Sequence, residues 1–114
     1  KNTPQEGYYL PSTMQNFLNL KKMVSARGAQ LVCVQYPTHP VAPLKKIFKG
    51  QEDILFVDNE WLFKKKIEQR GYDKYFIDSF AGHFGHCTNL GNQILAQNIA
   101  DAILKNPLKP ITDN

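Results

Sequence analysis

Apolar residues recur along much of this chain with the spacing of helices that are buried on one side. The spacing predicts helices over residues 11–27, 60–70 and about 88–104. Gly28 and Gly71 follow the first two of these segments, and a glycine after the last turn is a common helix end. We therefore expect three helices that each pack one face against a core.

Each helix start is expected to carry a polar cap, because a side-chain oxygen can accept a free N–H group of the first turn. Ser12 or Thr13 is expected to cap the first helix. Asp58 or Asn59 is expected to cap the second. The residues expected to face the core are Trp61, Leu62, Phe63 and Ile67 in the second helix and Leu90, Ile94, Leu95, Asn98, Ile99 and Ile103 in the third.

Two short apolar runs lack the helical period. Residues 29–37 form a nearly continuous run rich in β-branched side chains, and residues 54–57 form a second run. Such runs are typical of strands that are covered on both faces in a parallel sheet. The prolines that follow the first run, up to Pro43, are expected to prevent regular structure before a short helix at 44–49.

Helices that alternate with buried strands predict an α/β fold with a parallel sheet and right-handed connections. Only two strands are predicted, and a two-stranded sheet leaves an unpaired edge on each side. The pattern therefore indicates part of a larger fold. We expect an N-terminal arm or linker at residues 1–10, one α/β unit at 11–105 and a loose tail at 106–114.

Composition and charge exclude some classes of partner. The chain of 114 residues is 42% hydrophobic, and no apolar run approaches the roughly 18 residues of a membrane span. The net charge of +4 comes from lysine clusters scattered over separate predicted helices. We therefore expect neither a nucleic-acid partner nor a membrane partner. The two cysteines, Cys33 and Cys87, are too few for a disulfide framework and are expected to be free thiols.

The candidate chemistry lies in residues 82–92, a loop with glycines that leads into the last helix. Its segment His86-Cys87-Thr88-Asn89-Leu90-Gly91-Asn92, followed by the apolar face of that helix, resembles the C-terminal block of the SGNH (GDSL-type) hydrolases. In that family a glycine stands five residues after the catalytic histidine, as Gly91 follows His86. The resemblance covers about residues 11–105. It implies the C-terminal half of a flavodoxin-like, three-layer α/β/α fold, with His86 as the catalytic base.

Two departures from the family pattern change the expected site. The position three residues before the histidine, an aspartate in the family, is His83 here. The Gly-Asp-Ser turn that carries the nucleophile and the oxyanion-hole blocks are absent from this sequence. A carboxylate orients a catalytic imidazole and stabilises its protonated form, whereas His83 supplies no negative charge. Asp78 is the nearest preceding carboxylate, and we hypothesise that the loop brings it to His86 as a substitute.

The resemblance implies an ester hydrolase that transfers an acyl group to water through a serine, with carbohydrate or lipid esters as substrates. This chain would supply the base, and a missing half would supply the nucleophile. The interpretation needs no cofactor and no metal ion. The alternative is a non-enzymatic or degenerate α/β module that pairs with a second copy or a partner chain through exposed sheet edges.

Other interpretations of single residues stay open at this stage. His86 alternatively caps or packs at a helix start without any chemistry. His83 and His86 alternatively bind a metal ion together, although no third ligand with suitable spacing is evident. His39 is expected to be an exposed loop residue. The aromatic residues before the last helix either line an acyl pocket or cover the core; they are Tyr75, Phe76, Phe80 and Phe84.

Overall fold

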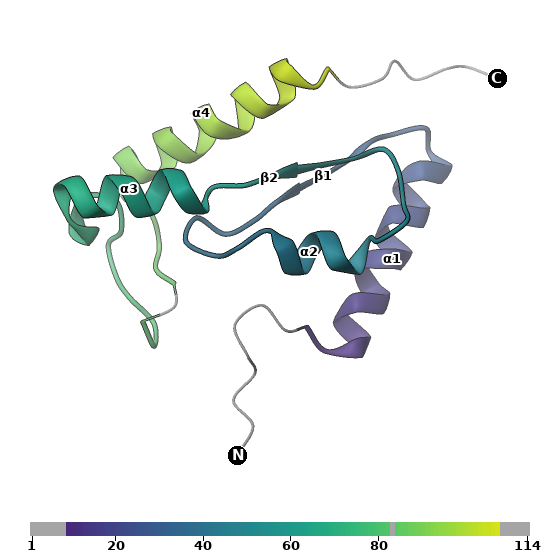
Figure 1. Ribbon diagram of the computed structural model, residues 1–114, viewed down its shortest axis with the longest axis horizontal. Coiled ribbons are helices and arrows are strands. Elements are labelled where there is room, and N and C mark those ends of the chain that lie inside the picture. The colour runs from purple at the N-terminus through teal and green to yellow at the C-terminus, as the bar shows by residue number, and fades with distance from the viewer. Residues whose placement is uncertain (1–8, 83, 108–114) are drawn as a thin grey trace.

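The computed structural model describes residues 9–82 and 84–107, which form four α-helices and a two-stranded parallel sheet (Figure 1). The mixed α/β class and the parallel pairing predicted from the sequence are confirmed. Most of the predicted arm and tail, residues 1–8 and 108–114, lies outside the described residues. The elements in chain order are α1 (Pro11–Ala26), β1 (Leu31–Val34), α2 (Ala42–Ile47), β2 (Ile54–Val57), α3 (Glu60–Arg70), the 3₁₀ turn η1 (Tyr72–Lys74) and α4 (Asn89–Lys105).

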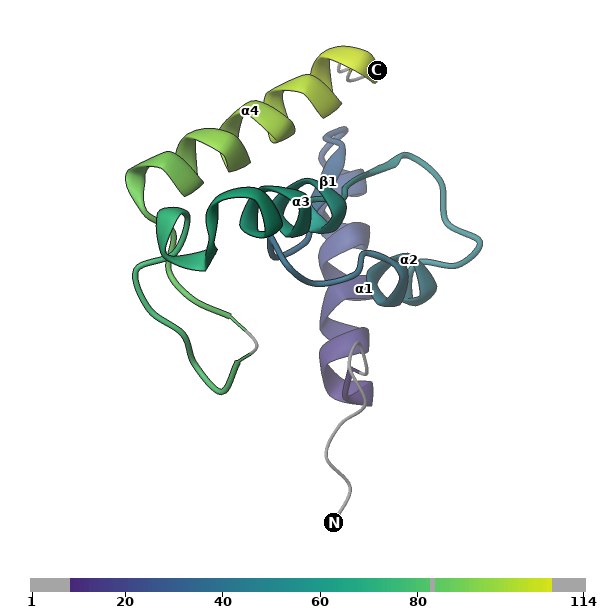
Figure 2. The same ribbon diagram turned by 60° about the vertical axis from the view of Figure 1, so that its left-hand side comes forward.

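Helices cover both faces of the small sheet. β1 and β2 pair in register, with Leu31 opposite Ile54 and Val34 opposite Val57. Helices α1 and α2 lie on one side of the strands and α4 lies on the other (Figures 1 and 2). On the α4 side, Val57 is 1% exposed but its neighbour Val34 is 41% exposed. This difference arises because α4 lies mainly against β2 and leaves β1 less covered.

The apolar core consists of two clusters. The first, the sheet-side cluster, contains the buried residues Cys33, Leu44, Ile47 and Phe48, which α1, α2 and one face of the sheet enclose. The second, the aromatic cluster, contains Phe63 of α3 with Tyr75 and Phe76 after η1, and apolar side chains of α4 pack against it. The predicted inner residues of α4 are all partly buried, which agrees with the apolar face derived from the sequence; they are Leu90, Ile94, Leu95, Asn98, Ile99 and Ile103.

A buried amide joins the ends of the strands to α4. Asn59 is 0% exposed, and its Nδ2 donates a hydrogen bond to the carbonyl of Gln35 at 2.7 Å. Its Oδ1 accepts a hydrogen bond of 2.6 Å from the side chain of Asn98. A buried amide with both ends paired adds directional contacts to an otherwise apolar interior. The carboxyl ends of β1 and β2 are therefore held at a fixed position beneath α4.

Several local predictions about the first half of the chain are wrong. The N-cap of α1 is Leu10, without a side-chain bond, so neither Ser12 nor Thr13 caps the helix. Pro11 occupies its first turn instead, where the missing N–H group has no intrahelical partner to lose. For the same reason α2 starts at Ala42 and includes Pro43, two residues earlier than predicted.

In the second half one expected core residue is exposed, and the cap of α3 is provided by Asp58, one of the two residues expected there. Trp61, expected in the core, is 69% exposed, and Phe63 is the residue of α3 that is fully buried. The N-cap residue of α3 is Asn59, but its side chain makes no capping bond. The carboxylate of Asp58 accepts the Glu60 N–H at 3.0 Å instead. The predicted boundaries of α3 agree with the structure, whereas the strand expected over 29–37 is shorter.

Candidate functional site

Residues 76–87 fold back on themselves to form an antiparallel turn, called the hairpin below. Phe76 pairs with Cys87, and Phe80 pairs with Phe84 nearer the tip. At the tip Gly82 has a φ of 71°, a left-handed conformation that glycine adopts without steric cost. The hairpin extends away from α3 and α4 and lies below them in Figure 1. Residue 83 lies outside the described part of the chain.

The start of α4 fixes the end of the hairpin. Thr88 caps the helix by accepting the Gly91 N–H at 3.1 Å, and its hydroxyl donates to the carbonyl of Lys74 at 2.8 Å. A Cβ atom added at Gly91 would overlap the carbonyl oxygen of Tyr75. The glycine five residues after His86 is therefore required by the close approach of α4 to the chain before the hairpin.

The hairpin brings the carboxylate of Asp78 against His86. The ring Nδ1 of His86 lies 2.8 Å from Oδ2 and 3.1 Å from Oδ1 of Asp78. The backbone N–H of His86 also donates to Oδ1 at 2.6 Å. Two groups of the same histidine therefore hold this carboxylate in one orientation.

Charge and protonation follow from this arrangement. The His86 backbone N–H, and then its ring, lower the pKa of the Asp78 carboxyl by favouring the ionised form. An ionised carboxylate only accepts hydrogen bonds, so the contact requires a hydrogen on Nδ1 of His86. The neutral ring then has its lone pair on Nε2, which has no hydrogen-bond partner among residues 9–82 and 84–107. A base with this tautomer is ready to accept a proton at Nε2.

The surface around His86 is open and aromatic. The side chain of His86 is 68% exposed, whereas that of Asp78 is 38% exposed. Phe80 and Phe84 stack on each other with centroids 5.1 Å apart, and both meet the His86 ring edge-on. Both phenylalanines are more than 40% exposed, so they do not cover the core. Of the four aromatic residues singled out in the sequence, Tyr75 and Phe76 are the two in the core.

The remaining predicted residues have these positions. His83, which stands in the place of the family's aspartate, lies outside the described residues, so its part in the site stays a prediction. His39, expected to be exposed, is partly buried, and its ring lies 4.9 Å from that of Tyr36. Cys33 and Cys87 are both free, as expected. Burial raises the pKa of the Cys87 thiol, which disfavours the nucleophilic thiolate.

Two tyrosines at the site were missed from the sequence. The hydroxyl of Tyr36 accepts the Gly85 N–H at 2.6 Å and also donates to the Gly85 carbonyl. The hydroxyl of Tyr72 donates to the carbonyl of Asp78 at 2.7 Å. Tyr36 precedes a proline at a strand end and Tyr72 begins a 3₁₀ turn. The sequence around these two tyrosines does not indicate that they bond Gly85 and Asp78.

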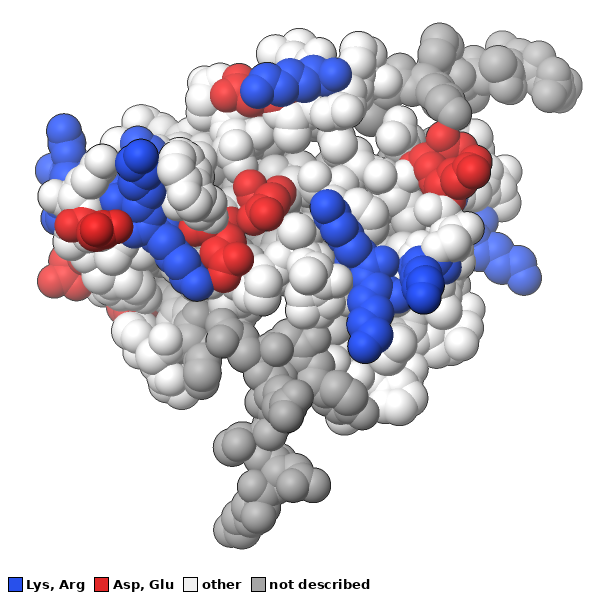
Figure 3. Space-filling view, in the orientation of Figure 1, with Lys and Arg blue, Asp and Glu red and all other residues white. Residues whose placement is uncertain are grey.

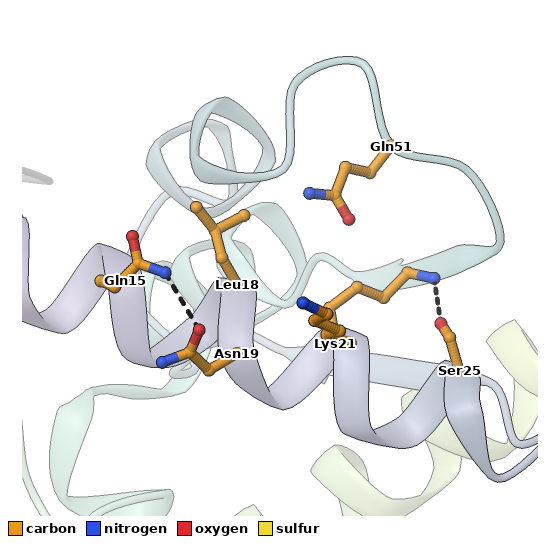
Figure 4. Close-up of a pocket in the computed structure, with 7 residues that line it drawn as sticks. Gln15, Leu18, Asn19, Lys21, Ser25 and Gln51 are labelled. Atoms are coloured by element: carbon orange, nitrogen blue, oxygen red, sulfur yellow. Dashed lines mark hydrogen bonds between the residues drawn. The ribbon is translucent and has the colours of Figure 1, made fainter.

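Other surface features lie away from the hairpin. A hollow beside α1 is lined mainly by polar side chains, and two of its pairs bond within the helix, Gln15 to Asn19 and Lys21 to Ser25 (Figure 4). On the face seen in Figure 3, lysine and arginine form separate groups with acidic residues between them. No cluster of three or more potential metal ligands occurs among the described residues. Within the same residues, every helix is too short or too polar to cross a membrane.

Comparison of the chain with models of protein families, with curated proteins and with solved structures finds no significant match in any of the three.

Proposed function

We propose that this chain is the C-terminal part of an SGNH-like serine ester hydrolase and that it supplies the catalytic base, His86. The observation that carries the proposal is the carboxylate of Asp78 on Nδ1 of His86, with Nε2 left open to solvent. This is the arrangement of a base and its orienting acid in serine hydrolysis. In the proposal, Asp78 takes the role of the family's aspartate, whose position His83 occupies in this sequence.

The sheet supports the view that a second half completes the fold. The described residues contain two strands, and both outer edges of this sheet are unpaired. Helices already lie on both sides of the strands, as in a flavodoxin-like three-layer α/β/α fold (Figure 2). Further parallel strands beside β1 would cover Val34 and add the loops that carry a nucleophile at the same carboxyl edge. The proposed missing half would therefore supply the serine and the oxyanion-hole donors.

In the proposed mechanism His86 moves two protons. Its neutral ring takes the proton of the serine hydroxyl at Nε2 while the serine oxygen attacks the ester carbonyl carbon. Asp78 stabilises the resulting imidazolium, which then gives the proton to the departing alkoxide. Water repeats the sequence on the acyl-serine intermediate and releases the acid. The family resemblance gives carbohydrate or lipid esters as the substrate class.

The test uses the natural protein that contains this chain, with p-nitrophenyl acetate as the ester. His86→Gln is expected to lower kcat by at least about a thousandfold, and Asp78→Asn by about a hundredfold or more. Because the His86 side chain is largely exposed, its replacement should leave the fold intact, as judged by circular dichroism. The matched control is Asp101→Asn on α4, which removes a carboxylate that accepts a hydrogen bond from Gln97 and should leave kcat unchanged.

A fluorophosphonate probe gives a second measurement on the same proteins. It should label a serine outside this chain in the natural protein, and His86→Gln should suppress the labelling. Turnover that survives His86→Gln, or a natural protein that neither turns over the ester nor reacts with the probe, would contradict the proposed function.

The exposed sheet edges favour a second candidate function, a non-enzymatic α/β module that pairs with another chain. Val34 is 41% exposed beside the unpaired edge of β1, and an open edge is a template for strand addition. This candidate predicts that sedimentation velocity of the chain shows concentration-dependent dimers. A charge at this position, Val34→Lys, should abolish them, whereas Met23→Lys on α1 should not. A monomer at all concentrations, together with ester turnover in the natural protein, would exclude it.

A further inference from the structure

Phe76 at its base is buried, but beyond the Phe76–Cys87 pair the hairpin that carries Asp78 and His86 has little burial of its own. Ile77 is 71% exposed, and Phe80 and Phe84 are 45% and 43% exposed. A segment with so few buried side chains gains little stability from the hydrophobic effect. Its geometry must therefore depend on the bonds that tie it to the rest of the chain.

Those ties are concentrated next to the two residues of the site. Tyr36 holds both backbone groups of Gly85, the residue directly before His86. Tyr72 holds the carbonyl of Asp78 itself. The two hydroxyls reach the hairpin from different directions, since Tyr36 follows β1 and Tyr72 begins η1. One strand of the hairpin is thus fixed to the sheet edge and the other to the 3₁₀ turn.

The tyrosine rings are anchored in the core. Tyr72 stacks on Phe76 with ring centroids 4.7 Å apart and planes 18° apart. Tyr36 meets Phe76 at 6.5 Å and the hairpin residue Phe84 at 5.8 Å. Phe76 is 1% exposed, so both hydroxyls are positioned by rings that pack against a buried neighbour. Anchored donors of this kind restrict a loop more than exposed side chains do.

The space around Gly85 shows how closely these groups approach each other. A Cβ atom added at Gly85 would overlap both the carbonyl oxygen of Asp78 and the hydroxyl of Tyr72. The two strands of the hairpin and the Tyr72 hydroxyl are therefore in close contact at Gly85. This contact is one residue from His86 and includes the backbone of Asp78.

We propose that Tyr36 and Tyr72 are positioning residues that close the hairpin at Gly85 and Asp78 and so keep the Asp78 carboxylate on Nδ1 of His86. Tyr36 in addition places this pair at the carboxyl end of β1, the edge where parallel α/β sheets bind ligands. The use of the pair in ester hydrolysis rests on the proposed function, whereas the positioning itself does not.

The experiment measures the pair directly in the chain by NMR, with Tyr36→Phe and Tyr72→Phe. Each variant removes one hydroxyl and keeps the ring. We expect the amide of His86, which donates to Asp78, to exchange its hydrogen about fivefold faster in each, the equilibrium equivalent of one hydrogen bond. The ¹⁵N shifts of the His86 ring should move from the form with a hydrogen on Nδ1 towards the form with a hydrogen on Nε2.

The matched control is Tyr75→Phe. Tyr75 belongs to the same cluster and is 2% exposed, but its hydroxyl has no hydrogen-bond partner within the described ranges. This variant should leave the exchange rate and the ring shifts of His86 unchanged. Equal changes in Tyr75→Phe, or no change in either of the other two variants, would overturn the positioning role.

Turnover separates this inference from the proposed function. In the natural protein, Tyr36→Phe should lower kcat for p-nitrophenyl acetate about fivefold or more with little change in KM. If the natural protein shows no ester turnover while the NMR changes occur, the proposed function fails and the positioning role stands. If turnover is present but the NMR signals of His86 do not respond, the positioning role fails and the proposed function stands.

Discussion

The two core clusters bury similar side chains but hold different structures in place. The sheet-side cluster is enclosed by α1, α2 and the strands, and its buried members carry no group that reaches the hairpin. The aromatic cluster contains the ring of Phe76, which stacks on Tyr72 and lies tilted against Tyr36, and the hydroxyls of these tyrosines bond the backbone around Asp78 and His86. Two equally buried clusters can therefore differ in role, because one stabilises the fold alone and the other also positions a polar site.

The largest expected effect comes from emptying the aromatic cluster. Phe63→Ala should lower the free energy of unfolding by about 3–5 kcal/mol, because the side chain is fully buried. Phe48→Ala in the sheet-side cluster should cost a similar amount. Of the two variants, only Phe63→Ala should also alter the NMR signals of His86. Phe63→Leu is a milder change that should keep the chain folded.

Trp61→Ala is the control on the same helix, and its cost should stay below about 1 kcal/mol because Trp61 is largely exposed. Urea denaturation measures all of these variants. A loss in Phe63→Ala no larger than in Trp61→Ala would show that the aromatic cluster does not support the fold.

A smaller effect is expected at the contact between α4 and Tyr75. Alanine is favoured over glycine inside a helix by about 1 kcal/mol, so propensity alone predicts that Gly91→Ala stabilises the chain. The structure predicts the opposite, a net loss of about 1–2 kcal/mol, because the new methyl group overlaps the carbonyl of Tyr75. Asn92→Ala, at an exposed neighbouring position, isolates the propensity term. A rise in the urea midpoint for Gly91→Ala would contradict the contact.

The helix caps should show a contrast of about 1 kcal/mol. Thr88→Ala removes the side-chain oxygen that accepts the Gly91 N–H, and losses of about 1 kcal/mol are typical of such caps. Thr13→Ala in α1 removes a threonine that makes no cap, so it should change stability much less. Thermal unfolding of the two variants measures the difference between their losses of stability. Equal losses in Thr88→Ala and Thr13→Ala would show that the Thr88 cap does not stabilise the start of α4.

The smallest effect concerns acid stability. The pKa of Asp78 is lowered in the folded chain, so its contribution is complete above its unfolded pKa of about 3.9. The contribution is lost as the pH falls through the lower folded value. The stability difference between the unchanged chain and Asp78→Asn should therefore be constant near pH 6 and disappear in acid. Urea midpoints of the two proteins at several pH values test this prediction. A stability difference that grows in acid would contradict it.

The sequence was sufficient to predict elements whose information is local. The period of α3 and the continuous run of β2 predicted their boundaries, and the expected class with a parallel sheet is confirmed. The predicted cap of α1 and the predicted burial of Trp61 are wrong, because Pro11 opens the first turn after Leu10 and α3 buries Phe63 rather than Trp61. Local patterns do not state which neighbour a helix face will meet.

The site was predictable only in part for the same reason. Asp78 and His86 were singled out by a short motif and by chemical need, and the structure places them in contact. Tyr36 and Tyr72 were not, since their bonds to Gly85 and Asp78 depend on how the hairpin folds back against β1 and η1. Whether Asp78 and His86 perform catalysis stays a prediction of the proposed function.

The buried amide of Asn59 has a consequence for how the molecule opens. Its two hydrogen bonds join Gln35, directly after β1, to Asn98 in the middle of α4, and its side chain is shielded from water. Separating α4 from the strands would leave the buried amide of Asn59 without a hydrogen-bond partner. The strands and α4 should therefore open together as one cooperative unit. Native-state hydrogen exchange should then report one common opening free energy for β1 and the centre of α4, and Asn59→Ala should split it into two.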